Sequence, residues 1–64
     1  MTVREVLKIL KKDGWYEVAQ NGSHKQFKHD VKKGKVTVPV HNGDLGAGTL
    51  KSILAQAGLR KEDI

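Results

Sequence analysis

Apolar residues recur with a helical period near the start of the chain. Four of them fall at positions i, i+3, i+4 and i+7, and therefore on one stripe of a helix: Val3, Val6, Leu7 and Leu10. Ahead of this stripe, Thr2 and Glu5 match a capping box, in which side chains bond the free backbone N–H groups of a helix start. Gly14 supplies a stop after it. The pattern predicts an amphipathic helix over residues 2–13.

The next region alternates between apolar and polar residues around Asn21-Gly22, a strong two-residue hairpin signal. We expect strands over residues 15–20 and 23–29. With Asn21 and Gly22 as the turn, the facing pairs are Gln20 with Ser23, Ala19 with His24, Glu17 with Gln26, and Tyr16 with Phe27. This register predicts an apolar side formed by Tyr16, Val18 and Phe27. The other side of the sheet then carries Glu17, Ala19, His24, Gln26 and Lys28.

A third strand is predicted over residues 35–40, because three valines alternate with other residues there. Pro39 cannot donate to a ladder, so it marks an edge position or the end of the strand. We expect Phe27 to meet Val38, which would bring His41 round to the side of His24. The longer loop before this strand does not fix that register.

A second helical stripe follows a glycine-rich loop, and it consists of Leu50, Ile53, Leu54 and Ala57. The helix should begin near Thr49 and end at Gly58. Leu59 is expected to return to the core, and residues 60–64 to form a polar tail or a last short turn.

The resulting order is helix, three antiparallel strands, helix. Each helix has one apolar stripe and the sheet has one apolar side, so both helices should pack on one face and leave the other face open. The predicted fold class is α+β with the order αβββα, the topology of a double-stranded-RNA-binding domain. Residues 1–64 should form a single domain.

Charge and composition limit the classes of partner that the protein could bind. The chain has 12 Lys and Arg against 7 Asp and Glu, a net charge of +5, which favours an anionic partner such as RNA. One Phe, one Tyr and one Trp are too few for an aromatic stacking platform. No cysteine is present, and no segment has the apolar length of a membrane span or the h-region of a signal peptide. We therefore expect a cytoplasmic protein.

Histidine is the main candidate for chemistry, because its charge changes near neutral pH. The three histidines are spaced by 5 and 12 residues and match no metal-ligand motif. The glycine-rich run at residues 43–48 lacks the Gly-Lys-Ser/Thr ending of a P-loop, although the following helix could offer N–H groups to a phosphate. Ser23 and His24 are adjacent in sequence and should point to opposite sides, so a serine triad is not supported.

The ordered set of motifs resembles the HicA toxins, which are mRNA interferases of toxin–antitoxin pairs. The matching runs cover nearly the whole chain. They are Asp13-Gly14-Trp15, Gly22-Ser23-His24-Lys25-Gln26-Phe27, Val36-Thr37-Val38-Pro39-Val40-His41, Gly48-Thr49-Leu50-Lys51-Ser52-Ile53-Leu54 and Ala57-Gly58-Leu59. The resemblance implies a double-stranded-RNA-binding-like fold, an mRNA substrate and a HicB antitoxin as partner. It also implies that His24, in the Gly-Ser-His run, is the catalytic residue.

The resemblance leads to an expected site without metal or cofactor. His24 would be the general base for the RNA 2′-hydroxyl. Lys25, Lys28, Ser23 and His41 are the candidates for RNA contact. Of the two lysines, Lys28 should share the face of His24. His41 could be the general acid or an ordinary loop residue.

Two neighbouring expectations complete this picture. Glu17, diagonal to His24 in the predicted register, would stabilise the protonated ring of His24, while His29 should point to the helix side. Two other classes stay open: a non-catalytic double-stranded-RNA-binding module, which would not need His24, and a protein-interaction domain.

Overall fold

A computed structural model describes residues 1–64, except for the side chain of Lys61. The backbone forms two α-helices, three strands and a short final 3-10 helix. In chain order these are α1 (Val3–Lys12), β1 (Trp15–Asn21), β2 (His24–His29), β3 (Val36–Pro39), α2 (Ala47–Ala57) and η1 (Lys61–Asp63). This order confirms the predicted α+β arrangement αβββα.

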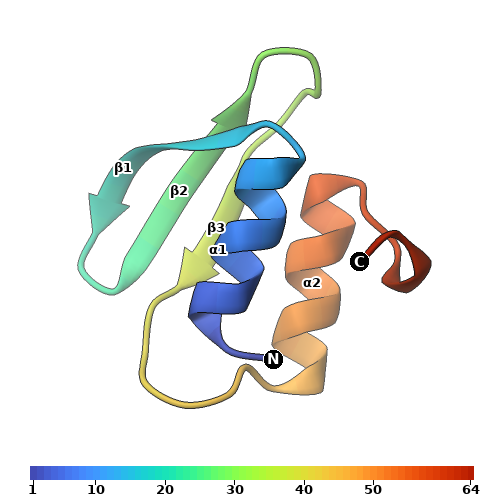
Figure 1. The fold of residues 1–64 in the computed structure, drawn as a ribbon. Helices are drawn as coiled ribbons and strands as arrows, with labels where there is room; N and C mark the ends of the chain where they lie inside the picture. Colours follow the sequence, from blue (N-terminus) through green and yellow to red (C-terminus); the bar gives the residue numbers. More distant parts are fainter.

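The three strands form one antiparallel sheet in the order β1-β2-β3. Both helices lie on the same side of this sheet (Figure 1), as the single apolar stripes predict. The core between the two layers is built from both helices, all three strands and the loop before α2. Its buried members are Val3, Val6, Leu10, Trp15, Phe27, Val36, Val38, Leu45, Ile53 and Ala57.

Helix α1 starts with the predicted capping box. The Thr2 hydroxyl accepts a hydrogen bond from the Glu5 backbone N–H at 3.2 Å, and the Glu5 carboxylate accepts one from the Thr2 backbone N–H at 2.9 Å. These bonds also hold the pKa of Glu5 below its ordinary value, with the backbone bond from Thr2 as the main cause. The helix ends at Lys12 with Asp13 as its C-cap, and Gly14 follows with a φ of +102°, a conformation that favours glycine.

The hairpin turn differs from the prediction by one residue. Gly22 and Ser23 form the turn, and Asn21 pairs with His24. Gly22 has a φ of +59° and Ser23 has no positive φ, the pattern of a type II′ turn with glycine first. The predicted pairs of Ser23, His24, Gln26 and Phe27 are therefore wrong. The observed pairs are Gln20 with Lys25, Ala19 with Gln26, Glu17 with Phe27, Tyr16 with Lys28, and Trp15 with His29.

The predicted apolar side of β1 is also wrong. A bulge at Val18 shifts the register between Glu17 and Ala19. Because of the new turn and the bulge, Tyr16 and Val18 are 45% and 46% exposed, and Trp15, at 2%, fills the core instead. Glu17 pairs with the buried Phe27, so it lies on the helix side and not beside His24 as expected.

The register of β3 differs from the expected one by two residues. Phe27 pairs with Val36, not Val38, and His24 pairs with Pro39. A shift of two keeps every valine on its face, so the hydrophobic pattern could not distinguish the two registers. Pro39 is the last residue of β3, as predicted.

Helix α2 begins at Ala47, two residues before the predicted start near Thr49. It ends as predicted at Gly58, which has a φ of +69°. Leu59 then returns to the core, and its N–H donates to the Leu54 carbonyl at 2.8 Å. Within the described part of the chain, neither helix is long and apolar enough to cross a membrane.

Candidate functional site

His24 opens β2 on the face of the sheet that carries no helix. The Gly22–Ser23 turn delivers the chain directly into this position. Successive side chains in a strand alternate between faces, and Phe27 points into the core, so His24 points away from it. The side chain of His24 is exposed. The predicted placement of His24 away from the core is confirmed.

A groove of about 390 Å³ lies beside His24, between the sheet and α2. The sheet contributes His24 and the outward-facing residues of β3, Thr37 and Pro39. The helix contributes Gly48, Thr49, Ser52, Ile53 and Gln56. We call this the His24 groove.

The α2 residues of the His24 groove were missed by the sequence reasoning. Thr49, Ser52 and Gln56 fall at i, i+3 and i+7, and so form a polar stripe beside the apolar one. That stripe is the signal that could have identified them. Its position at the outer edge of β3 depends on the packing of α2, which the pattern alone does not give.

Gln56 joins α2 to the edge of β3. Its side-chain oxygen, Oε1, accepts a hydrogen bond from the Thr37 backbone N–H at 3.0 Å. Its amide nitrogen, Nε2, donates to the Ser52 hydroxyl at 3.3 Å. Because β3 is the last strand of the sheet, its outer N–H groups have no neighbouring strand, and Gln56 supplies an acceptor for one of them.

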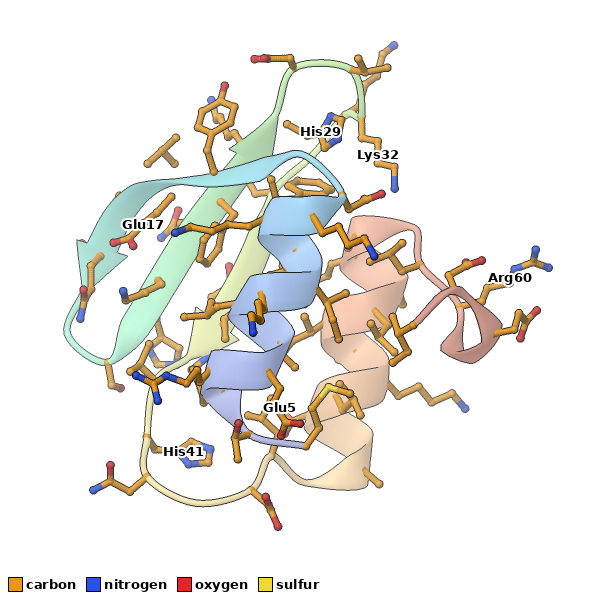
Figure 2. All side chains as sticks on the ribbon, viewed as in Figure 1. Glu5, Glu17, His29, Lys32, His41 and Arg60 are labelled. Atoms are coloured by element: carbon orange, nitrogen blue, oxygen red, sulfur yellow. The ribbon has the colours of Figure 1, made fainter. Side chains whose placement is uncertain are left out.

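Lys25 lies on the helix side of the sheet, on the opposite face from His24. Its ammonium group pairs with the Glu17 carboxylate at 3.1 Å. Both residues border a second groove of about 400 Å³ between α1 and the hairpin, together with Val3, Arg4, Leu7, Lys8, Lys11 and Phe27. Figure 2 labels Glu17 on β1. The structure therefore separates Lys25 and Glu17 from His24.

The other candidates for RNA contact occupy three different places. Lys28 is exposed and shares the open face with His24, about 13 Å farther along β2 at about 3.3 Å per residue. Ser23 is a turn residue, and its carbonyl accepts from the Val40 N–H at 2.6 Å. His41 lies in the exposed loop after β3 (Figure 2), with Nδ1 at 3.0 Å from the Asn42 carbonyl. His41 does not border the His24 groove.

His29, at the other end of β2, is held in a hydrogen-bonded cluster on the helix side, as predicted. Its Nδ1 accepts from the N–H groups of Val31 and Lys32, both at 3.0 Å. Nε2 must then carry the proton and donate to the Asp13 carbonyl at 2.6 Å. The ring packs edge-on against Trp15, with centroids 5.1 Å apart. Figure 2 shows His29 and Lys32 at the opposite end of the molecule from His41.

Lys32 and Asp13 close this cluster. The Lys32 ammonium donates to the Asp13 carboxylate at 2.5 Å and to the Ala57 carbonyl, at the end of α2, at 3.0 Å. The indole N–H of Trp15 donates to the same carboxylate at 3.0 Å. The hydrogen bond from Lys32 is the main reason why the pKa of Asp13 is lowered. These contacts tie the ends of both helices to the sheet and assign His29 a structural role.

No group of three or more His, Cys, Asp or Glu side chains suited to a metal ion comes together among the described residues. Comparison with known families gives one match: the family model described as the HicA toxin of bacterial toxin–antitoxin systems matches residues 3–59. A search of curated proteins found no match. The family match spans α1, the whole sheet and α2, and so includes both His24 and the groove beside it.

Proposed function

The chain belongs to the HicA toxin family of bacterial toxin–antitoxin systems, and on that premise we propose that it cleaves RNA with His24 as the general base. The HicA toxins are known as mRNA interferases. One observation carries the proposal: the histidine of the Gly-Ser-His run is exposed at the start of β2, beside a groove that hydroxyl and amide side chains border. A site with this placement is open to a long polymeric substrate.

The proposed reaction uses the nucleophile that RNA itself carries, the 2′-hydroxyl. A ring nitrogen of His24 takes the hydroxyl proton, and the 2′-oxygen bonds to the adjacent phosphorus. The bond from phosphorus to the 5′-oxygen breaks, and that oxygen receives a proton from a general acid. The products are a 2′,3′-cyclic phosphate and a 5′-hydroxyl. His41 lies in the loop two residues beyond Pro39, the partner of His24, and as the candidate acid in this proposal it would approach the leaving oxygen from outside the His24 groove.

The basic side chains would supply affinity through phosphate contacts. Lys28 shares the face of His24, but a separation of about 13 Å along the strand is too large for both to contact one phosphate group. Lys28 would therefore hold a neighbouring phosphate and set the path of the RNA across the sheet. Lys25 is paired with Glu17 on the other face and would add only to the general positive field.

A cleavage assay with purified protein and RNA tests the role of His24. His24→Ala should lower the cleavage rate by roughly 10²–10⁴-fold, the usual cost of losing a general base. His24→Gln, which keeps a polar side chain but cannot titrate, should be equally impaired. Thermal unfolding checks that both variants fold. A folded His24→Ala protein that cleaves at the wild-type rate would refute the proposal, and RNA binding without cleavage by the wild type would indicate a non-catalytic module.

The chemistry of the product ends is a separate test. The reaction should proceed in excess EDTA and leave 2′,3′-cyclic phosphate ends, because the 2′-hydroxyl and His24 need no metal in the proposed step. Activity that returns only with an added divalent metal, or products with 3′-hydroxyl ends, would contradict this mechanism.

Membership of a toxin–antitoxin family implies an antitoxin partner. We infer that a HicB-like antitoxin of acidic character covers the open face and blocks His24. We also infer that the toxin and the antitoxin both act in the cytoplasm. Charge complementarity with a toxin of net charge +5 would also speed association.

Hydrogen exchange of the complex tests this occlusion. Protection should appear over residues 15–29 and in the loop that contains His41, and RNA cleavage should stop. Protection confined to residues 60–64, with cleavage unaffected, would show that the antitoxin acts elsewhere.

A further inference from the structure

A chain of three side-chain and backbone groups leads from the edge of β3 into the His24 groove. It runs from the Thr37 N–H to Gln56 and on to the Ser52 hydroxyl, with bonds of 3.0 Å and 3.3 Å. Thr37, Gln56 and Ser52 all border the groove together with His24. These linked hydrogen bonds therefore affect which donors and acceptors face a molecule in the groove.

The direction of each bond follows from the chemistry of the groups. A backbone N–H can only donate, so the Gln56 atom next to Thr37 must be the carbonyl oxygen. The other end of the Gln56 amide is then the NH₂ group, which also can only donate. The Ser52 oxygen must accept from it. The O–H proton of Ser52 takes no part in this bond, so it can donate to a ligand.

The groove suits an anion with acceptor oxygens. Among the described residues that border it, none has an acidic side chain. Ser52 and Thr49 bring hydroxyl groups from neighbouring turns of α2, on the side across from His24 and Pro39. A phosphodiester has non-bridging oxygens that accept hydrogen bonds, and bonds to such charged acceptors are stronger than neutral ones.

We propose that Ser52 donates a hydrogen bond to a non-bridging oxygen of the RNA phosphate in the His24 groove, and that Gln56 positions the hydroxyl for it. This inference rests on the proposed RNA cleavage and adds two residues to that site. Ser52 binds the phosphate and Gln56 is a positioning residue. The hydrogen bond holds the scissile phosphate beside His24, so that the developing charge on its oxygen meets a preoriented donor.

Two substitutions separate the parts of this arrangement. Ser52→Ala removes the donor, and alanine is the best helix former, so the variant should fold. Gln56→Glu keeps the acceptor for the Thr37 N–H but replaces the NH₂ group by an oxygen. That oxygen would accept the Ser52 proton and turn the hydroxyl away from the ligand. Lys51→Gln is the matched control, because it makes the same change of one charge unit on the same helix outside the groove.

The primary measurement is kcat/KM for cleavage of an RNA oligonucleotide. Ser52→Ala should lower kcat/KM by roughly 10–100-fold, the range for a hydrogen bond to a charged group. Gln56→Glu should cause a comparable loss, and the double variant should lose little more than Ser52→Ala alone, because both changes remove one interaction. Lys51→Gln should lower kcat/KM only by a small factor, because it removes one unit of the general positive charge and no group of the groove.

A sulfur substitution gives a readout that a merely structural role would not move. The RNA carries a phosphorothioate of defined stereochemistry at the cleaved linkage, since sulfur is a weaker acceptor than oxygen. One of the two diastereomers should slow the wild type but have little further effect on Ser52→Ala. Lys51→Gln should keep the wild-type stereochemical preference.

The possible outcomes are distinct. If the wild type cleaves and His24→Ala does not, but Ser52→Ala cleaves at the wild-type rate or keeps the full stereochemical preference, then the role of Ser52 is wrong and the role of His24 stands. A folded Gln56→Glu protein with unchanged kcat/KM would remove Gln56 from the arrangement. If the wild type does not cleave RNA, the proposed function itself fails.

Discussion

The two ends of β2 carry histidines in opposite circumstances. His29 is half-buried, and both of its ring nitrogens are engaged, one with the Asp13 carbonyl and the other with the N–H groups of Val31 and Lys32. His24 is exposed, and among the described residues its ring has no hydrogen-bond partner. It borders a groove of about 390 Å³ instead of packing against an aromatic ring. One strand therefore holds a histidine bound into the structure and a histidine exposed beside a groove.

The difference follows from position on the strand. An odd separation of five residues places the two rings on opposite faces of the sheet. On the helix face, His29 lies beside the end of α1 and donates to the Asp13 carbonyl, while its other nitrogen accepts from the N–H groups of Val31 and Lys32 in the loop after β2. Both nitrogens of this ring are therefore occupied by the protein itself. On the open face, the ring of His24 has no such partners among the described residues, as the proposed role in proton transfer requires.

The largest expected effect contrasts the two histidines in catalysis. His24→Ala should reduce RNA cleavage by roughly 10²–10⁴-fold with an unchanged melting temperature. His29→Ala should leave the cleavage rate of the folded fraction within a small factor of the wild type. Both rates are measured at a temperature where each variant is folded by circular dichroism. Equal losses in both folded variants would end the distinction between the two rings.

For stability the expected order is the opposite: the loss of the His29 ring should matter and the loss of the His24 ring should not. His29→Ala leaves the Asp13 carbonyl and two backbone N–H groups without their partner, which should cost about 1–3 kcal/mol of unfolding free energy. In a domain of this size each kcal/mol lowers the melting temperature by roughly 4–8 °C. Urea unfolding provides the measurement. His41→Ala, at an exposed loop position, is the control and should unfold like the wild type.

The lysines on the two faces of the sheet should also differ, in how much each contributes to the salt dependence of RNA binding. This effect is smaller than the effects at the histidines. Lys28→Ala, on the face of His24, should reduce the slope of log K against log salt by about 0.7–0.9, the value of one phosphate contact. Lys25→Ala should leave the slope nearly unchanged, because Lys25 pairs with Glu17 behind the sheet. RNA titrations at several salt concentrations, in a His24→Ala background, measure both. A larger change for Lys25→Ala would place the RNA over α1.

The smallest expected effect is a pH dependence of the unfolding free energy that comes from Asp13, which lies beside His29. The hydrogen bond from Lys32 lowers the pKa of Asp13 from its ordinary value of 3.8 in the unfolded chain. The carboxylate therefore contributes stability that is fully present above pH 3.8 and is lost as the pH falls through the lower folded pKa. The contribution should be about 1 kcal/mol or less, since the Lys32 side chain is 35% exposed.

Asp13→Asn measures this contribution. The variant should be less stable than the wild type at neutral pH, and the difference in unfolding free energy should shrink toward zero in acid. A difference that stays constant down to pH 2 would mean that the Asp13 charge is not its source.

Local interactions made much of the fold predictable from sequence. Each signal for a helix involves residues that are close together in the sequence. These signals are the capping box of Thr2 and Glu5, the two apolar stripes and the terminating glycines, and both helices form as expected. Alternation across β2 likewise separates His24 from His29 without further information. The Gly-Ser-His run predicts His24 as the candidate catalytic residue, and the residues that match the family model include it.

The details of the sheet required tertiary structure. Both Asn21-Gly22 and Gly22-Ser23 are plausible turns, and the choice between them moved every pair of the hairpin. The bulge at Val18 then placed Trp15 in the core and left Tyr16 outside. In β3, registers that differ by two residues bury the same valines, so only the fit of the packed layers selects one.

The His24 groove shows most clearly what the chain by itself determined and what only the tertiary structure decided. Sequence determined that α2 has a polar stripe and that His24 lies on the open face, because both follow from local periodicity. The tertiary structure decided that Thr49, Ser52 and Gln56 border the groove beside His24. That juxtaposition depends on α2 packing along the outer edge of β3, where Gln56 bonds the free N–H of Thr37. Contacts between residues 19 positions apart arise from the packing of whole elements, which no local pattern specifies.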